Sequence, residues 1–253
     1  MNIIKVDASN IEKDGFFCRM SKSETQGNQN KMKWLKERFK EGLTMQLLDI
    51  KEGGRGYIEY IPGKYAFRAI NAENYLVIHC LWVVGKSQKQ GFAKKLVEQC
   101  IEDAKKQKLD GIAILTSEKT WLIKKSFFEH LGFKSVTKTE DKIFNIMTLK
   151  FDDKAKDPSF CKDYEKKAKV GNKGFTVFYT HQCPYIDDAV EIVKKFAQKK
   201  NIPFQTILLN TAEEVRTKSP SPYGTFGIIY KDKLISYTYL LEKDLEKLIT
   251  EIG

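Results

Sequence analysis

The chain has 253 residues, enough for one large domain or two modest ones, and 42% of them are hydrophobic, as in an ordinary globular protein. The formal net charge is +11, but lysines alternate with acidic residues along the whole length, so we do not expect nucleic-acid binding. No apolar run reaches the roughly 18 residues that a membrane span needs, and the N-terminus lacks the layout of a signal peptide. We therefore expect a cytoplasmic protein without membrane contact.

The cysteines and histidines do not indicate a metal site or a disulfide framework. The five cysteines are odd in number, widely scattered and never spaced as C-x-x-C. The three histidines are equally dispersed. We expect no metal ion, and most thiols should be reduced.

The first part of the chain predicts a mostly antiparallel sheet. A helix is expected around residues 34–39, after a polar segment at 21–32. The strands expected in this part are residues 1–10, 44–50, 56–60, 65–70 and 75–84, with a turn at 51–54.

A short glycine-containing turn, residues 88–93, is the most informative stretch. It follows the apolar run 75–84 and precedes a helical pattern at 92–109. Several backbone N–H groups at the positive end of a helix dipole form a cradle for phosphate. Gly91 has no Cβ, so the backbone can approach a ligand closely, and Ala93 keeps the first helical turn slim. The spacing fits neither G-x-G-x-x-G nor G-x-x-x-x-G-K-[ST], and an ordinary strand-to-helix turn is the alternative interpretation.

The elements that follow give this turn a context. A buried strand is expected at 111–115 and a second helix at 121–133, ended by Gly132. Closing strands follow within 134–151. Gln88, Gly91 and Ala93 match Q/R-x-x-G-x-G/A, and residues 127–133 match F-Y-E-x-L-G-F except at Phe128. The chain thus resembles the GNAT superfamily of N-acetyltransferases, whose turn holds the pyrophosphate of acetyl-coenzyme A.

This resemblance implies an α/β (α+β) fold with a mixed central sheet flanked by helices. It also implies a splayed strand whose backbone pairs with the pantetheine of acetyl-coenzyme A. The cofactor-binding residues that follow from it are Leu81, Trp82, Val83, Val84, Gln88, Lys89, Gln90, Gly91, Phe92, Ala93 and Lys94.

Three side chains are candidates for catalysis. Glu59 is a carboxylate in an expected strand near the sheet centre, and burial would raise its pKa enough for it to accept a proton. His79 is the second candidate base, although both residues could equally have structural roles. The tyrosine that relatives use to protonate the leaving thiolate is Phe128 here, so Ser126 or water would replace it, or no acid is needed. Trp121 stands where relatives often carry asparagine.

The second part of the chain predicts another domain. We expect an acetyltransferase domain at 1–151, a charged linker at 152–172 and a smaller domain at 173–253. The order β-α-β-α-β-β-α in the last segment resembles a minimal thioredoxin fold, and the combination resembles YoaP-like acetyltransferases.

Cys183-Pro184-Tyr185-Ile186 lies where glutaredoxins carry C-P-Y-C. A helix N-terminus there would lower the pKa of the Cys183 thiol. Ile186 replaces the second cysteine, which rules out dithiol exchange within the motif, and Thr225 stands where a cis-proline is expected.

Three functions remain open. The first is transfer of an acetyl group from acetyl-coenzyme A to an amine of a small molecule, a peptide or a protein terminus, by direct attack. The second is a monothiol redox module that uses Cys183. The third is a non-catalytic sensor of acyl-coenzyme A, which the missing tyrosine makes plausible.

Overall fold

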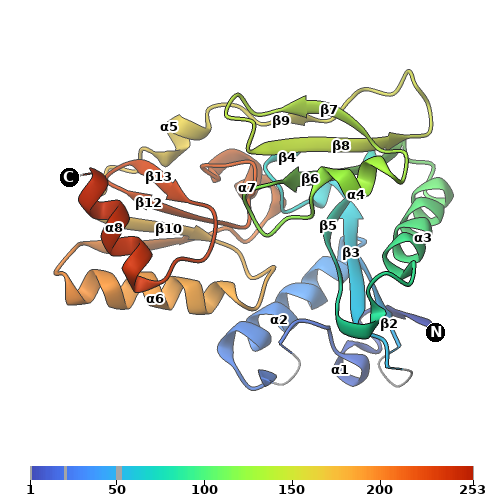
Figure 1. The fold of residues 1–253 in the computed structure, drawn as a ribbon, viewed down its shortest axis with the longest axis horizontal. Coiled ribbons are helices and arrows are strands. Elements are labelled where there is room, and N and C mark those ends of the chain that lie inside the picture. Colours follow the sequence, from blue (N-terminus) through green and yellow to red (C-terminus); the bar gives the residue numbers. More distant parts are fainter. Residues whose placement is uncertain (1, 20–21, 50–52, 253) are drawn as a thin grey trace. The chain divides into compact units, whose positions relative to one another are not determined.

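A computed structural model describes residues 2–19, 22–49 and 53–252 of the chain (Figure 1). The expected turn residues 51 and 52, and residue 50 of the expected strand 44–50, lie outside this part. The chain divides into two compact units. The first comprises Met1–Ser21, Met32–Ala66 and Ile70–Phe160, and the second comprises Lys22–Lys31, Phe67–Ala69 and Cys161–Gly253.

The first unit is built on a mixed seven-stranded sheet in the order β1-β2-β3-β5-β6-β8-β7. All neighbouring strands in it are antiparallel except β5 and β6, which are parallel. The strands are β1 (Ile3–Val6), β2 (Thr44–Leu48), β3 (Gly56–Pro62), β5 (Tyr75–Val83), β6 (Gly111–Ser117), β7 (Lys134–Lys138) and β8 (Phe144–Lys150). The helices in this part of the chain are α1 (Ile11–Asp14), α2 (Gln26–Lys40), α3 (Phe92–Lys106) and α4 (Lys125–Glu129), and residues 26–31 of α2 belong to the second unit.

Helix α3 packs its apolar face on the sheet. Leu96, Val97, Cys100 and Ala104 recur at helical spacing and are buried, while lysines and glutamates cover the rest of the helix. The helix contacts strands β3, β5 and β6. The sheet side of this core includes Ile58 and Tyr60 of β3, and Leu76, Ile78 and Leu81 of β5. The helix predicted at 92–109 is confirmed.

Strand β5 carries a β-bulge that shapes the middle of the sheet. Its pairing with β3 runs from Cys80 opposite Glu59 to Ile78 opposite Tyr60, so His79 is the extra residue. Ile78 and Leu81 both face the core under α3. The two residues between them, His79 and Cys80, therefore project to the opposite face of the sheet. A regular strand would place only one of them there.

Three sequence predictions were wrong in detail. Residues 65–70 do not form a strand of the main sheet. Residues Gly63–Tyr65 form a 3₁₀ turn, and only β4 (Ile70–Asn71) is extended, pairing with β9 (Ser159–Phe160). The apolar pattern there reflects burial of Phe67 and Ala69 rather than strand pairing.

The helix predicted at 121–133 is much shorter, because α4 is only five residues long. In the segment before α4, side-chain oxygens accept hydrogen bonds from backbone N–H groups instead. Ser117 Oγ accepts from the N–H of Lys119 at 3.1 Å, and Thr120 Oγ1 accepts from the N–H of Leu122 at 3.2 Å. Conversely, α2 is longer than expected and includes part of the segment predicted to be polar loop.

The second unit contains a four-stranded sheet in the order β11-β10-β12-β13, in which β10 and β11 are parallel and the other pairs antiparallel. Its strands are β10 (Phe175–Tyr179), β11 (Phe204–Leu208), β12 (Phe226–Tyr230) and β13 (Lys233–Ser236). Its helices are α5 (Tyr164–Ala168), α6 (Ile186–Lys199), α7 (Ala212–Lys218) and α8 (Glu242–Ile252). The predicted element order is confirmed, and the relation to thioredoxins remains a prediction.

Within residues 2–19, 22–49 and 53–252, no helix has the length and apolar character that crossing a bilayer requires.

Candidate active site

A groove of about 570 Å³ lies in the first unit, where the end of β5 meets the start of α3. Its lining combines apolar side chains with the glycine-containing turn. It is formed by Leu81, Trp82, Val83, Ser87, Gln88, Lys89, Gly91, Phe92, Ala93, Lys94, Ile123 and Phe127. Pockets of this size and composition are typical of small-molecule sites.

Most of the residues predicted to bind the cofactor meet in this groove. Val84 and Gln90 are the two that do not line it. The N–H of Val84 donates to the carbonyl of Arg55 at 2.9 Å, and the Gln90 amide bonds the carbonyl of Lys86. Sequence reasoning missed Ser87, Ile123 and Phe127. Of these, only Phe127 carried a signal, because it belongs to the motif at 127–133.

The turn itself has an anion-binding geometry. Gly91 caps the N-terminus of α3 in the left-handed conformation, with φ 78°, and Lys89 also has a positive φ, 60°. A turn of this kind directs successive backbone N–H groups to one side, at the positive end of the helix dipole. A Cβ built on Gly91 would meet nothing within 4 Å, so the space beside it is open. The glycine is needed here for its backbone conformation.

Strands β5 and β6 separate next to this turn. Their parallel pairing ends at Ile78 opposite Ile114, although β5 continues to Val83 and β6 to Ser117. On its other edge, β5 stays paired with β3 as far as Val83. The separation begins directly after the bulge at His79, since a bulge bends its strand. The edge of β5 that faces away from β3 can therefore pair with the amide groups of an extended ligand.

Glu59 and His79 meet on the face of the sheet opposite α3. Glu59 Oε1 lies 3.2 Å from His79 Nδ1, and both side chains are almost completely buried, at 1% and 0% exposed. The bulge brings the imidazole to this face, beside a residue of the neighbouring strand. A carboxylate paired with an imidazole in a buried site can accept and hold a proton.

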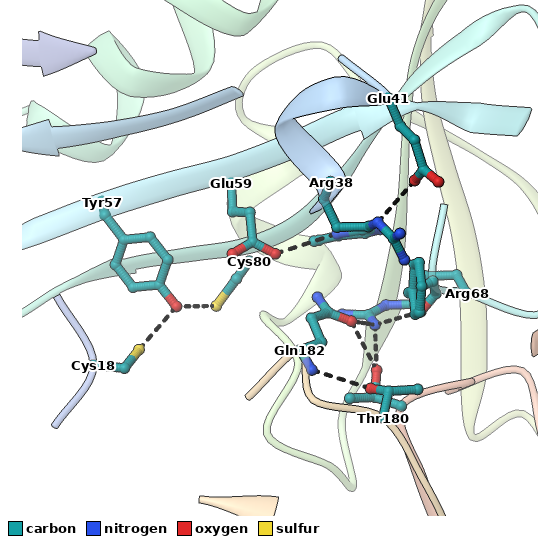
Figure 2. A network of polar contacts seen from close by, with 12 residues as sticks. Cys18, Arg38, Glu41, Tyr57, Glu59, Arg68, Cys80, Thr180 and Gln182 are labelled. Atoms are coloured by element: carbon teal, nitrogen blue, oxygen red, sulfur yellow. Dashed lines mark hydrogen bonds and ion pairs between the residues drawn. The ribbon is translucent and has the colours of Figure 1, made fainter. Parts of the chain in front are cut away.

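Helix α2 covers this pair. The ring of Trp34 lies 6.1 Å from the imidazole of His79, and the guanidinium of Arg38 lies 5.9 Å from the centre of the Trp34 ring. Arg38 Nε is in turn 2.8 Å from Glu41 Oε2 (Figure 2). Burial raises the pKa of Glu41, and Arg38 opposes that shift. These contacts connect His79 to Glu41 through two side chains of α2.

Tyr57 forms a second polar group on the same face. Its hydroxyl donates to Cys80 Sγ at 2.9 Å and lies 3.1 Å from Cys18 Sγ, so that it bridges the two sulfurs (Figure 2). Burial is the main reason that the pKa of Tyr57 is well above its usual value, and the neighbouring Cys18, Cys80 and Glu59 raise it further. Tyr57 is consequently a neutral hydrogen-bond donor. Sequence reasoning missed it, because nothing in the sequence pairs residues 18, 57 and 80.

The residues proposed around the leaving thiolate have different environments. Ser126 is exposed on α4, one position before the groove residue Phe127. Phe128 is fully buried in the core under α3, where it contacts the rings of Phe127 and Phe133. Trp121 is exposed, with 62% of its surface accessible. The position of the family tyrosine thus belongs to the hydrophobic core.

In the second unit, Cys183 is half-buried just before α6. The carbonyl of the next residue, Pro184, packs so closely on Gly27 that a Cβ there would lie 2.1 Å from it. His181 Nδ1 lies 3.6 Å from Asp187 Oδ2.

None of the five cysteines, all within the described residues, forms a disulfide. Among the described residues, no three His, Cys, Asp or Glu side chains form a group that could hold a metal ion.

Comparison with known proteins decides the family. The model of the acetyltransferase (GNAT) family matches residues 14–133. The uncharacterized N-acetyltransferase YoaP of Bacillus subtilis (strain 168) is 34% identical over 256 residues, covering 100% of both chains. The chain belongs to the GNAT acetyltransferase family. Membership confirms the predicted enzyme class, an acetyltransferase, and the predicted cofactor, acetyl-coenzyme A.

Solved structures give weaker matches. An aminoglycoside 6'-N-acetyltransferase complexed with coenzyme A is 15% identical and aligns with 62% of this chain and 100% of its own, with a TM-score of 0.43. The ribosomal-protein-alanine N-acetyltransferase of Brucella melitensis is 16% identical and aligns with 60% of this chain and 100% of its own, with a TM-score of 0.42.

The residues of the groove fit acetyl-coenzyme A. The open space beside Gly91 and the N–H groups of the turn suit a pyrophosphate, and the side chains of Lys89 and Lys94 add positive charge at the same place. The edge of β5 from His79 to Val83 suits the amide groups of a pantetheine arm.

Proposed function

We propose that the protein transfers the acetyl group of acetyl-coenzyme A to an amine by direct attack, and that Glu59 and His79 together accept the proton of that amine. The observation that supports this proposal is the 3.2 Å contact between these two buried side chains. It lies at the bulge of β5, where the strand separates from β6.

The cofactor side of the reaction rests on the groove. Bound acetyl-coenzyme A supplies a thioester as the acetyl donor. The turn around Gly91 holds the pyrophosphate through backbone N–H groups, and the edge of β5 holds the pantetheine. Because β5 leads from the turn back to the bulge, the two ends of the site are parts of one continuous segment, residues 79–94.

The acceptor side needs a base, since an amine is mostly protonated near neutral pH and attacks only with its lone pair exposed. The imidazole of His79 can take the proton, and the carboxylate of Glu59 stabilises the imidazolium that forms. Burial of both groups excludes water from the pair, so the pair retains its mutual interaction at full strength. The opposite arrangement, in which Glu59 takes the proton directly, uses the same two residues.

The acceptor belongs to the broad class of amines, in a small molecule or a peptide, and a panel of amines tests the proposal. Release of coenzyme A is measured with a thiol reagent, while calorimetry measures binding of acetyl-coenzyme A. Turnover with at least one amine, and its loss in Glu59→Gln, supports the proposal. Binding without turnover across the panel favours the sensor instead. Undiminished acetyl transfer after alkylation of Cys183 excludes the thiol as the group that performs the reaction.

A further inference from the structure

The cluster of Cys18, Tyr57 and Cys80 is not used by the acetyl-transfer scheme above. It lies on the same face of the sheet as Glu59 and His79, because the bulge turns both His79 and Cys80 away from the core under α3. Cys80 directly precedes Leu81, which lines the cofactor groove, and belongs to the part of β5 that has separated from β6.

The hydrogen bonds of the cluster have a direction. The Tyr57 hydroxyl has one proton and donates it to Cys80 Sγ at 2.9 Å. The contact of 3.1 Å between Tyr57 Oη and Cys18 Sγ must then use the thiol proton of Cys18. The hydrogen bonds therefore form a chain that is directed from the Cys18 thiol through the Tyr57 hydroxyl to the Cys80 thiol. Cys80 accepts from Tyr57 and keeps its own thiol proton.

The two positions that the family motif suggests supply no evident acid for the same reaction. Phe128, at the position of the tyrosine in the family motif, has no hydroxyl and is completely buried in the core. Ser126 is exposed on α4. The half-buried thiol of Cys80, by contrast, lies on the strand that we assign to the pantetheine arm.

We propose that the Cys80 thiol protonates the departing thiolate of coenzyme A and that Tyr57 and Cys18 return the proton to Cys80. This inference rests on the proposed acetyl transfer and adds an acid to it. The amine nitrogen forms a bond to the acetyl carbon, the bond from that carbon to sulfur breaks, and the electron pair leaves with sulfur.

The protons balance in this scheme. The acceptor loses one proton to solvent before it attacks as a neutral amine; the proton that it loses on attack goes to Glu59 and His79, and the Cys80 proton goes to the coenzyme A sulfur. Tyr57 then gives its proton to the Cys80 thiolate while it takes one from Cys18, so that no phenolate is formed. Solvent supplies the proton that Cys18 has lost and removes the one held by the base pair between turnovers. Transfer from one thiol to another thiolate is close to balanced in free energy, because the two groups have similar acidity.

Three variants and one control test this proposal by steady-state kinetics, with an amine that the wild-type protein acetylates. In Cys80→Ala we expect kcat to fall roughly 10- to 100-fold, near the low end of what general acid catalysis contributes, since a thiolate is a good leaving group. The affinity for acetyl-coenzyme A, measured by calorimetry, should stay unchanged. Cys80→Ser keeps the size of the side chain, but a hydroxyl is a far weaker acid than a thiol, so its kcat should fall as it does in Cys80→Ala. Tyr57→Phe keeps the ring but interrupts the relay, and should lower kcat in the same way.

Cys161→Ala is the matched control, because Cys161 is also a half-buried thiol but belongs to the second unit. The kcat of this variant should equal that of the wild type. A wild-type kcat in Cys80→Ala overturns the proposal. So does a wild-type kcat in Cys80→Ser, or a loss of acetyl-coenzyme A affinity that parallels the loss of kcat, because a packing role explains both. Absence of turnover in the wild type with every amine instead contradicts the proposed function itself.

Discussion

The carboxylate of Glu59 in β3 lies 3.2 Å from the imidazole of His79 in β5. The backbone partner of Glu59 is nevertheless Cys80, because His79 is the extra residue of the bulge. Removal of the bulge would turn either His79 or Cys80 into the core. The bulge therefore determines which side chains of β5 lie on the same face of the sheet as Glu59.

Glu59→Gln should lower kcat by about 100-fold, since the neutral amide neither accepts a proton nor stabilises an imidazolium. The affinity for acetyl-coenzyme A should not change, because Glu59 does not line the groove. Steady-state kinetics and calorimetry measure the two quantities. Glu37→Gln, on an exposed glutamate of α2, is the control and should leave both unchanged. Equal kcat values for the two variants would contradict a catalytic role for the pair.

Gly91→Glu should abolish binding of acetyl-coenzyme A. The new side chain places bulk and negative charge in the open space beside the turn, and any residue other than glycine is strained at φ 78°. Gly171→Glu is the control for backbone strain, because Gly171 has a similar φ of 72° and open space around it but lies in the second unit. This variant should be strained in the same way and still bind acetyl-coenzyme A. Unchanged affinity in a folded Gly91→Glu variant would mean that the cofactor binds elsewhere.

Phe128→Tyr should destabilise the protein without raising kcat, although it restores the tyrosine of the family motif. Phe128 is fully buried among apolar side chains, so a hydroxyl there loses its hydration, at a cost of about 1–3 kcal/mol. Urea unfolding measures this loss. Phe127→Tyr is the comparison, since Phe127 lines the groove and its hydroxyl could reach solvent. An increase in kcat for Phe128→Tyr would show that the core opens at this position.

Stability should fall in alkaline solution as the pH rises above about 10, the ordinary pKa of tyrosine. Burial raises the pKa values of Tyr57 and Tyr60 in the folded protein. Because the unfolded chain releases these protons first, the stabilisation is complete below pH 10 and is lost as the pH rises toward the folded pKa values. Unfolding by urea at a series of pH values measures the effect, and Tyr57→Phe should reduce its slope. An unchanged slope would indicate that Tyr57 ionises normally.

Gly27→Ala should destabilise the second unit, although alanine in place of glycine usually stabilises a helix by roughly 0.5–1 kcal/mol. In α2, a Cβ at this position would lie 2.1 Å from the carbonyl oxygen of Pro184, so the loop that contains Cys183 must move. Thermal unfolding gives the sign of the change, and alkylation of Cys183 should become faster. A stabilised variant would show that Gly27 does not pack against this loop.

Local sequence patterns predicted much of the first unit. The apolar spacing of α3 and the run that became β5 correspond to burial in the core, and a turn with glycine between them was recognised from residues 88–93. Helix α4 was predicted too long, because Ser117 and Thr120 hold backbone amides in turns that a periodic pattern does not reveal. The short strand β4 was misread for a related reason, since burial in a loop gives the same apolar pattern as burial in a strand.

The amino-acid sequence by itself indicated the family, the position of the glycine turn before α3 and the absence of the motif tyrosine at Phe128, because each depends on residue types at fixed spacing along one segment. The tertiary structure alone decided that Glu59 meets His79 and that Tyr57 bridges Cys18 and Cys80. Both clusters join residues that are 20 or more positions apart, and both depend on one extra residue in β5. A one-residue shift in register reverses the face of a side chain, and only the pairing of the strands fixes that register.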